Sequence, residues 1–152
     1  MPEAKTLKRA KEDKAEGKAP STQAGEFVRE EVDHIREGKH GARSTKQAIA
    51  IGLSKARRAG VKLAAPGRGT SRSTRRKAAA DTRKGRSAGK RKARPSARRS
   101  RASEGALKRE GRSAGSRTAL SRQARSAAAK RGPASRSASA RAAARTRASR
   151  SR

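Results

Sequence analysis

The chain has 152 residues and a formal net charge of +32, with 44 Lys and Arg against 12 Asp and Glu. It contains no Cys, Trp or Tyr and a single Phe, which excludes disulfides, thiolate metal sites and aromatic platforms for stacking single-stranded bases. Much of its apolar content is Ala, and the large apolar side chains gather between residues 27 and 63, so we expect one small folded unit with a tail on either side.

Residues 1–20 mix Lys with Glu and Asp and contain good helix formers, but they lack an apolar stripe that could dock a helix. We therefore expect a charged, flexible arm exposed to solvent. The arm has no apolar core of the kind that a secretory signal needs, and no segment approaches the length of a transmembrane helix. We expect a cytoplasmic protein, located at the nucleoid, that does not engage a membrane.

Residues 21–65 have the pattern of a helical hairpin. Apolar residues from Phe27 to Ile35 recur at helical spacing and Gly38 suits a C-cap, which predicts a first helix at about 21–38. The run from Ser44 to Gln47 matches a capping box and Gly60 suits a stop, which predicts a second helix at about 44–60. A two-helix unit of this size is marginal by itself, so we expect a homodimer or a protein partner to cover it.

Residues 66–152 hold 29 of the 44 Lys and Arg but three of the 12 acids. This density of like charge repels itself, and few apolar side chains offset the entropy of ordering, so we expect a disordered tail rich in Arg, Ser and Ala. Helix-compatible residues at 104–131 suggest a helix that forms when phosphates neutralise the Arg side chains. The predicted fold class is therefore a small all-α protein: a helical hairpin flanked by disordered tails.

Lys and Arg side chains of the hairpin and the tail are the candidate contacts to nucleic-acid phosphates, because each contact releases condensed counterions. Recognition motifs built on aromatic residues, GxxG loops in strand context and zinc-finger spacings are missing, which predicts backbone-led binding with little sequence selectivity. The candidate residues are Lys39, Arg43, Lys46, Lys55, Arg57, Arg58, Arg75, Arg76, Lys77, Lys90, Arg91, Lys92, Arg94, Arg98, Arg99, Arg101, Arg122, Arg125, Lys130 and Arg131.

Two further patterns resemble parts of functional sites. The loop 38–46 places Gly, Lys and Arg beside a helix N-terminus, which suits a phosphate-backbone anchor but departs from the order of an NTPase loop. His34 and His40 lie near Glu30 and Glu37, but two His without a second pair are a weak metal motif. We expect no metal, no cofactor and, for want of a core able to form a pocket, no enzymatic activity.

The stretch from Gly25 to Ser44, continuing from Lys46 to Arg57, resembles a family of small basic bacterial proteins catalogued as a domain of unknown function. The resemblance covers about 25–63, and the segment 119–124, Ala-Leu-Ser-Arg-Gln-Ala, is similar to a tail element of those proteins. In composition the tail is similar to bacterial histone H1-like proteins. The resemblance implies a bacterial source and assigns no activity.

Together these patterns favour a non-enzymatic, nucleoid-associated protein that binds the DNA phosphate backbone. Two alternatives remain open at this point. A polycation discriminates poorly between polyanions, so the partner could instead be RNA or the ribosome. The hairpin could also be a protein-interaction module that the basic tail only localises.

Overall fold

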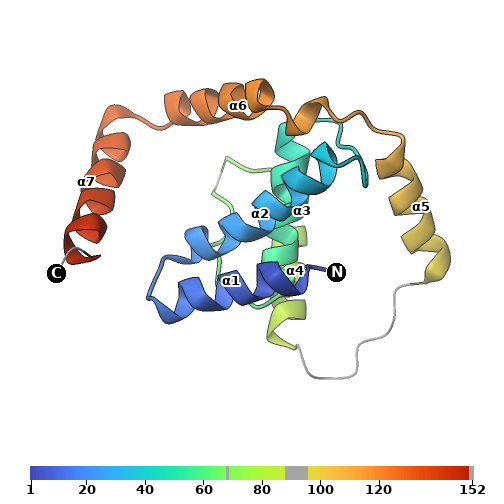
Figure 1. The fold of residues 1–152 in the computed structure, drawn as a ribbon, viewed down its shortest axis with the longest axis horizontal. Coiled ribbons are helices and arrows are strands. Elements are labelled where there is room, and N and C mark those ends of the chain that lie inside the picture. The colour runs from blue at the N-terminus through green and yellow to red at the C-terminus, as the bar shows by residue number, and fades with distance from the viewer. Residues whose placement is uncertain (68, 88–95, 151–152) are drawn as a thin grey trace. The chain divides into compact units, whose positions relative to one another are not determined.

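A computed structural model describes residues 1–67, 69–87 and 96–150 of the chain (Figure 1). All regular elements in these ranges are helical, which confirms an all-α fold. Residues 1–116 form one compact unit and residues 117–152 a second, and each is described by itself. The α-helices are α1 (Ala4–Ala15), α2 (Pro20–Arg36), α3 (Thr45–Arg58), α4 (Arg72–Arg86), α5 (Ala97–Lys108), α6 (Arg117–Lys130) and α7 (Pro133–Arg150), and a 3-10 turn, η1, spans Ser113–Gly115.

The helices α2 and α3 occupy the places of the two helices expected from the sequence. The Ser44 hydroxyl caps α3 by accepting a hydrogen bond from the Gln47 N–H at 3.2 Å. Gly38 and Gly60 follow the C-terminal ends of α2 and α3 with φ of +77° and +94°, in the left-handed region that glycine adopts without strain. The loop between Gly38 and Ser44 then carries the chain from one helix to the other.

The apolar core of the first unit consists of two clusters. Ala10, Ala24, Phe27, Ala56 and Val61 form the first, with the partly buried Leu7, Leu53 and Leu63 packed against it. Ile35, Ala42, Ala48 and Ala114 form the second. Phe27 and Ile35 are completely buried, and most of their neighbours are alanines, so the helices approach one another closely rather than through bulky side chains.

The expected flexible arm contains the helix α1, which packs against α2. Its buried side consists of Thr6, Ala10 and Asp13, which recur at helical spacing. Asp13 pairs with Lys18 at 2.5 Å, so even the charge on this side has a partner. A stripe of small and polar residues gives little apolar periodicity, which is why the sequence pattern did not predict the docking.

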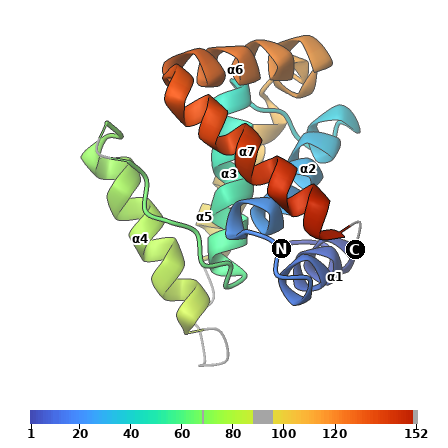
Figure 2. The same cartoon turned by 90° about the vertical axis from the view of Figure 1, so that its left-hand side faces the viewer.

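Part of the expected disordered tail is the helix α4, which packs along α3 (Figure 2). Ala78, Asp81 and Gly85 are its buried residues, again a face of small and polar side chains. The 3-10 turn η1 also belongs to that tail, and its Ala114 closes the second core cluster. The first unit is therefore a multi-helix bundle in which α1, α4 and η1 cover the hairpin from within the same chain.

The second unit consists of α6 and α7, and its described side chains are exposed or half-buried. The expected induced helix at 104–131 overlaps the end of α5, η1 and α6, which are separate elements here. Within the described residues, no helix is both long and apolar enough to cross a membrane.

Candidate nucleic-acid interface

The helix α4 presents a dense group of exposed cations on the side opposite its packing face. Five arginines fall within an arc of about 100° around the helix axis, roughly opposite the buried Ala78, Asp81 and Gly85. The arc extends over about 21 Å along the helix at the usual rise per residue. The five are Arg72, Arg75, Arg76, Arg83 and Arg86. We call them the α4 arginine face.

Gly85 allows α4 to approach α3 closely. A Cβ at Gly85 would collide with the backbone carbonyl oxygen of Arg57, so only glycine fits at this crossing. At its other end, the Ser71 hydroxyl caps α4 by accepting from the Thr74 N–H at 3.2 Å. The helix axis is thus fixed by backbone contact, and the α4 arginine face is left to point away from the bundle.

A buried carboxylate also ties α4 to α3. The Asp81 side chain, 6% exposed, accepts from the Arg58 Nε at 2.8 Å and from the Ser54 hydroxyl at 2.6 Å. Arg58 also donates to the Ser54 hydroxyl at 2.8 Å, which closes a three-membered network. Arg58, a predicted phosphate contact, therefore has a second role as the cation that holds the only acid of α4.

Lys55 departs from its predicted role as a phosphate contact. Its side chain is 20% exposed, and its ammonium lies 2.7 Å from a carboxylate oxygen of Glu31 and 3.1 Å from one of Glu30. Burial by itself lowers the pKa of Lys55, but the hydrogen bonds and charges of the two carboxylates outweigh burial and raise the pKa above its ordinary value. A lysine paired with two buried acids is already neutralised within the protein, which disfavours it as a phosphate contact.

The pKa of Glu30 reflects the same competition between burial and ion pairing. Burial raises the pKa of its carboxyl, whereas hydrogen bonds from Thr6, the Glu3 N–H and Lys55 together bring the pKa below its ordinary value. The Glu3 N–H donates to Glu30 at 3.0 Å, which attaches the start of α1 to α2. This cluster of charges is a structural joint between three helices.

The loop 38–46, considered above as a phosphate anchor, uses its amides inside the protein. The Gly41 N–H donates to the Leu107 carbonyl at 2.9 Å and the Ala42 N–H to the Gly111 carbonyl at 3.1 Å. Because Gly41 and Ala42 are buried against the segment after α5, these amides do not face a ligand. The side chains of Arg43 and Lys46 remain exposed, so an anchor here would depend on charge alone.

The other predicted contacts fall into three groups. Lys39 and Arg57 have partners within the protein: Lys39 pairs with Glu37 at 2.9 Å and with Glu3 at 3.3 Å, and Arg57 donates to the Ala64 carbonyl at 3.2 Å. Exposed contacts are Arg75, Arg76, Lys77, Arg98, Arg99, Arg101, Arg122, Arg125, Lys130 and Arg131. Lys90, Arg91, Lys92 and Arg94 lie outside the described residues.

Three members of the α4 arginine face were missed in the sequence, Arg72, Arg83 and Arg86. The signal was present as arginines recurring at helical spacing around a stripe of Ala78, Asp81 and Gly85. The segment was expected to be disordered, and a disordered chain has no faces. Helical spacing in an Arg-rich segment therefore carries information even where large apolar residues are missing.

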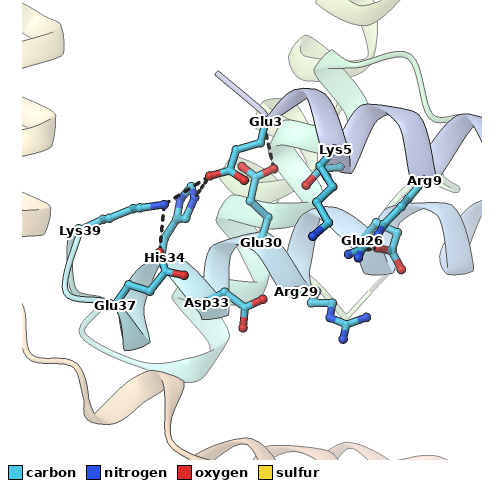
Figure 3. A pocket seen from close by; sticks show the side chains of 11 residues that line it. Glu3, Lys5, Arg9, Glu26, Arg29, Glu30, Asp33, His34, Glu37 and Lys39 are labelled. Atoms are coloured by element: carbon cyan, nitrogen blue, oxygen red, sulfur yellow. Dashed lines mark hydrogen bonds and ion pairs between the residues drawn. The ribbon is translucent and has the colours of Figure 1, made fainter.

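A hollow of about 170 Å³ lies where α1 meets α2, and Figure 3 shows the side chains that line it. Acids and bases alternate around it, among them Arg9 and Glu26, whose charged atoms lie 3.6 Å apart. Its lining lacks the apolar surface that a small-molecule pocket needs to gain affinity. The hollow is therefore part of the contact between α1 and α2, where ion pairs join the two helices.

Comparison with known proteins gives one match. No curated protein and no solved structure matches the chain. The expected resemblance to a family of unknown function is confirmed, and it starts at residue 5 rather than near residue 25, so that it includes nearly all of α1. The helix α4 and the residues after it lie beyond the match. Residues 5–68 of this chain match DUF6496, a family of unknown function.

Proposed function

We propose that this chain is a non-enzymatic nucleic-acid-binding protein that binds the phosphate backbone of DNA with little sequence selectivity and resides at the nucleoid. The observation that carries the proposal is the α4 arginine face, an array of exposed cations on a helix that is docked through its opposite side. Arginine suits this role because its planar guanidinium binds phosphate through two parallel hydrogen bonds.

A docked helix has an advantage over a free basic tail. Its backbone is already ordered, so binding costs only the freedom of the side chains. The diameter of an α-helix also fits the DNA major groove, whose walls are phosphate backbones. Exposed arginines along α5, α6 and α7 add further sites of the same chemistry, which favours neutralisation of a long stretch of DNA.

The proposal predicts that α4 accounts for a disproportionate share of the salt dependence of binding. Replacing the five residues of the α4 arginine face by Gln should lower the log-log salt slope by up to about 4.5, because each lost phosphate contact contributes about 0.9. The measurement is fluorescence anisotropy with a labelled duplex from about 50 to 300 mM salt, the range in which such contacts dominate.

The matched control removes the same charge from the second unit, by replacing Arg131, Arg136, Arg141, Arg145 and Arg147 with Gln. It should lower the slope by clearly less than the α4 variant, because those side chains lie on helices without buried residues or between them. Equal slopes for the two variants would remove α4 as the interface. Affinity that does not fall with salt, or tighter binding to RNA duplex than to DNA duplex, would overturn the proposal itself.

A further inference from the structure

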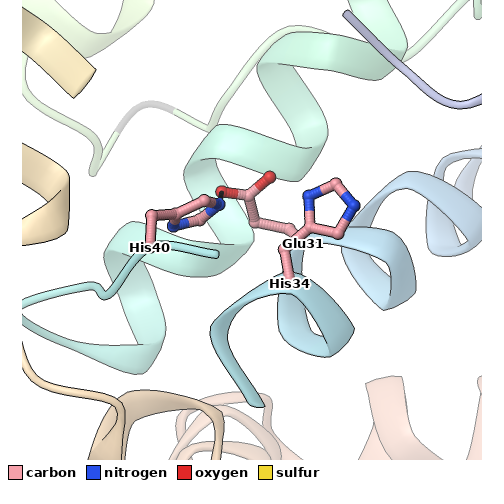
Figure 4. A group of neighbouring side chains, drawn as sticks. All are labelled: Glu31, His34 and His40. Atoms are coloured by element: carbon pink, nitrogen blue, oxygen red, sulfur yellow. Dashed lines mark ion pairs between the residues drawn. The ribbon is translucent and has the colours of Figure 1, made fainter. Parts of the chain in front are cut away.

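Two histidines and a buried glutamate converge at the end of α2, as Figure 4 shows. Glu31 and His34 lie one turn apart on α2, and the glycine turn at Gly38 brings His40 back over the same helix. One potential ligand atom from each of the three side chains lies within 4.8 Å of the others. The sequence had suggested Glu30 and Glu37 as neighbours of the histidines, and the structure selects Glu31 instead.

Each imidazole has one ring nitrogen engaged by an oxygen outside the cluster. His40 Nδ1 lies 3.1 Å from the Gly41 carbonyl oxygen, which can only accept, so Nδ1 carries the proton. His34 Nε2 lies 2.8 Å from a carboxylate oxygen of Glu3, which likewise favours a proton on Nε2. The neutral rings are thereby left with an unprotonated nitrogen each, Nε2 of His40 and Nδ1 of His34. Such outer oxygens fix the tautomer and orientation of metal-binding histidines.

The unprotonated nitrogen of His40 faces another acceptor. His40 Nε2 lies 3.2 Å from a carboxylate oxygen of Glu31. Two acceptors at this distance require either an additional proton on His40 or a cation between them. Two ligands of one tetrahedral zinc ion lie about 3.3 Å apart at ordinary bond lengths. The separation is thus compatible with an ion held by both groups as well as with a hydrogen bond between them, and the position of His34 within 4.8 Å of both supplies a third ligand for an ion.

One oxygen of the Glu31 carboxylate faces the histidines, and the other faces Lys55. The Glu31 side chain is 1% exposed, and its second oxygen lies 2.7 Å from the ammonium of Lys55. The ammonium of Lys55 lies beside that second oxygen without a well-aligned hydrogen bond, and the first oxygen lies on the side of His40. Glu30 and Glu31 share Lys55, and Glu3 and Glu37 share Lys39, so the acids around the two histidines outnumber the lysines in a strongly basic protein.

We propose that Glu31, His34 and His40 bind a divalent transition-metal ion, with Zn²⁺ the best fit. Two imidazole nitrogens and one carboxylate oxygen form a ligand set that Zn²⁺ accepts and that Mg²⁺ and Ca²⁺ do not favour. Bonding requires only that His34 move toward the pair formed by Glu31 and His40. The ion would join α2 to the loop 38–44, which in turn holds the segment after α5 through Gly41 and Ala42. Glu3 acts as a positioning residue through His34.

The test is calorimetric titration of the tag-free, full-length chain with Zn²⁺ alone, and with Co²⁺ to record the visible absorption of a tetrahedral site. The chain has two His and no Cys, so imidazole ligation can come only from these two rings. We expect one equivalent of metal to bind. His34→Ala and His40→Ala should each weaken binding at least about tenfold, and Glu3→Gln by about ten- to a hundredfold.

The control is Glu37→Gln, which removes an exposed carboxylate at the end of the same helix and should leave affinity unchanged. Circular dichroism of each variant shows whether its helices persist. If a histidine variant unfolds, the Co²⁺ spectrum of the unmodified chain and the Glu3→Gln affinity still decide the question. The proposal would be overturned if the unmodified chain gave no tetrahedral Co²⁺ spectrum. It would also be overturned if the unmodified chain and the His34→Ala, His40→Ala double variant bound Zn²⁺ with equal affinity.

Discussion

Lys55 illustrates how a residue of a common type can have an uncommon role. In a chain with 44 Lys and Arg, its position in the sequence gives no sign that it differs from the rest. Its ammonium balances Glu30 and Glu31, whose side chains are 2% and 1% exposed. Removing one partner of a buried pair leaves an uncompensated charge, which costs far more than the loss of a surface pair.

Lys55→Met should therefore lower the free energy of unfolding by on the order of 3 kcal/mol, because methionine fills the volume but leaves two buried carboxylates without their cation. Urea titration followed by circular dichroism measures the change. The control Lys8→Met breaks an exposed pair with Glu12, in which the side chains are 79% and 54% exposed. That change should stay within about 0.5 kcal/mol. A similar, small effect for both variants would show that the pair around Lys55 is solvated.

Among the helices, the sequence predicted the two that have capping residues and large apolar side chains, α2 and α3. The Ser44 cap, Gly38 and Gly60 placed α2 and α3 well, because a cap or a left-handed glycine is a local requirement that can be read from local residues. The docked helices α1 and α4 were not predicted. Their buried faces consist of Thr, Ala, Asp and Gly, which leave no apolar periodicity to detect.

The residues of the candidate sites also differ in whether the sequence alone could predict them. Individual exposed cations such as Arg75 and Arg76 could be predicted from charge alone. The face that they share with Arg72 could not, because a face exists only once the segment is helical and one side of it is docked. The convergence of His40 on Glu31 also depends on tertiary structure, since a loop rather than a helical repeat brings them together.

The contact at Gly85 allows the docking of α4 to be tested by one substitution. Gly85→Ala should lower the free energy of unfolding by about 1–3 kcal/mol, because the added methyl group meets the backbone at Arg57 and α4 must move away. The same variant should show a smaller salt slope in DNA binding, since an undocked α4 no longer presents an ordered face. Both quantities are measured on the full chain.

Gly25→Ala is the matched control, because Gly25 also lies within a helix but an added Cβ meets nothing within 4 Å. This substitution should raise stability by about 0.5–1 kcal/mol through the lower entropy of the unfolded chain, and it should leave the salt slope unchanged. A Gly85→Ala chain that behaved like Gly25→Ala would mean that α4 is not held at this crossing.

At the scale of the whole molecule, charge is distributed very unevenly. All 12 acids lie within residues 1–116, where most of them form ion pairs, some within one helix and some between helices, and residues 117–152 contain 11 Lys and Arg with no acid at all. Salt screens little the ion pairs that Lys55 and Arg58 form with buried carboxylates, whereas it screens strongly the repulsion among exposed cations. Salt should thus act in opposite directions on folding and on binding.

We expect the midpoint of thermal unfolding to rise between about 0.01 and 0.3 M salt, because the Debye length falls from about 30 Å to well below 10 Å and self-repulsion weakens. Over the same range the affinity for DNA should fall. Differential scanning fluorimetry with an extrinsic dye and anisotropy on one preparation compare the two. A midpoint that falls with salt would mean that exposed ion pairs, rather than repulsion, dominate the electrostatics of the fold.

The turn η1 has a consequence for how the protein is made. Arg36 donates to the Gly115 carbonyl and Thr45 to the Ala114 carbonyl, contacts that span 79 and 69 residues. A chain that emerges from the ribosome N-terminus first can form α2 and α3 long before residues 113–115 are synthesised. Until then Ile35 lacks the cover that Ala114 and Gly115 give it. A product of interrupted translation that ends before this turn would keep that isoleucine uncovered, and cellular proteases would meet an apolar side chain that the finished chain conceals.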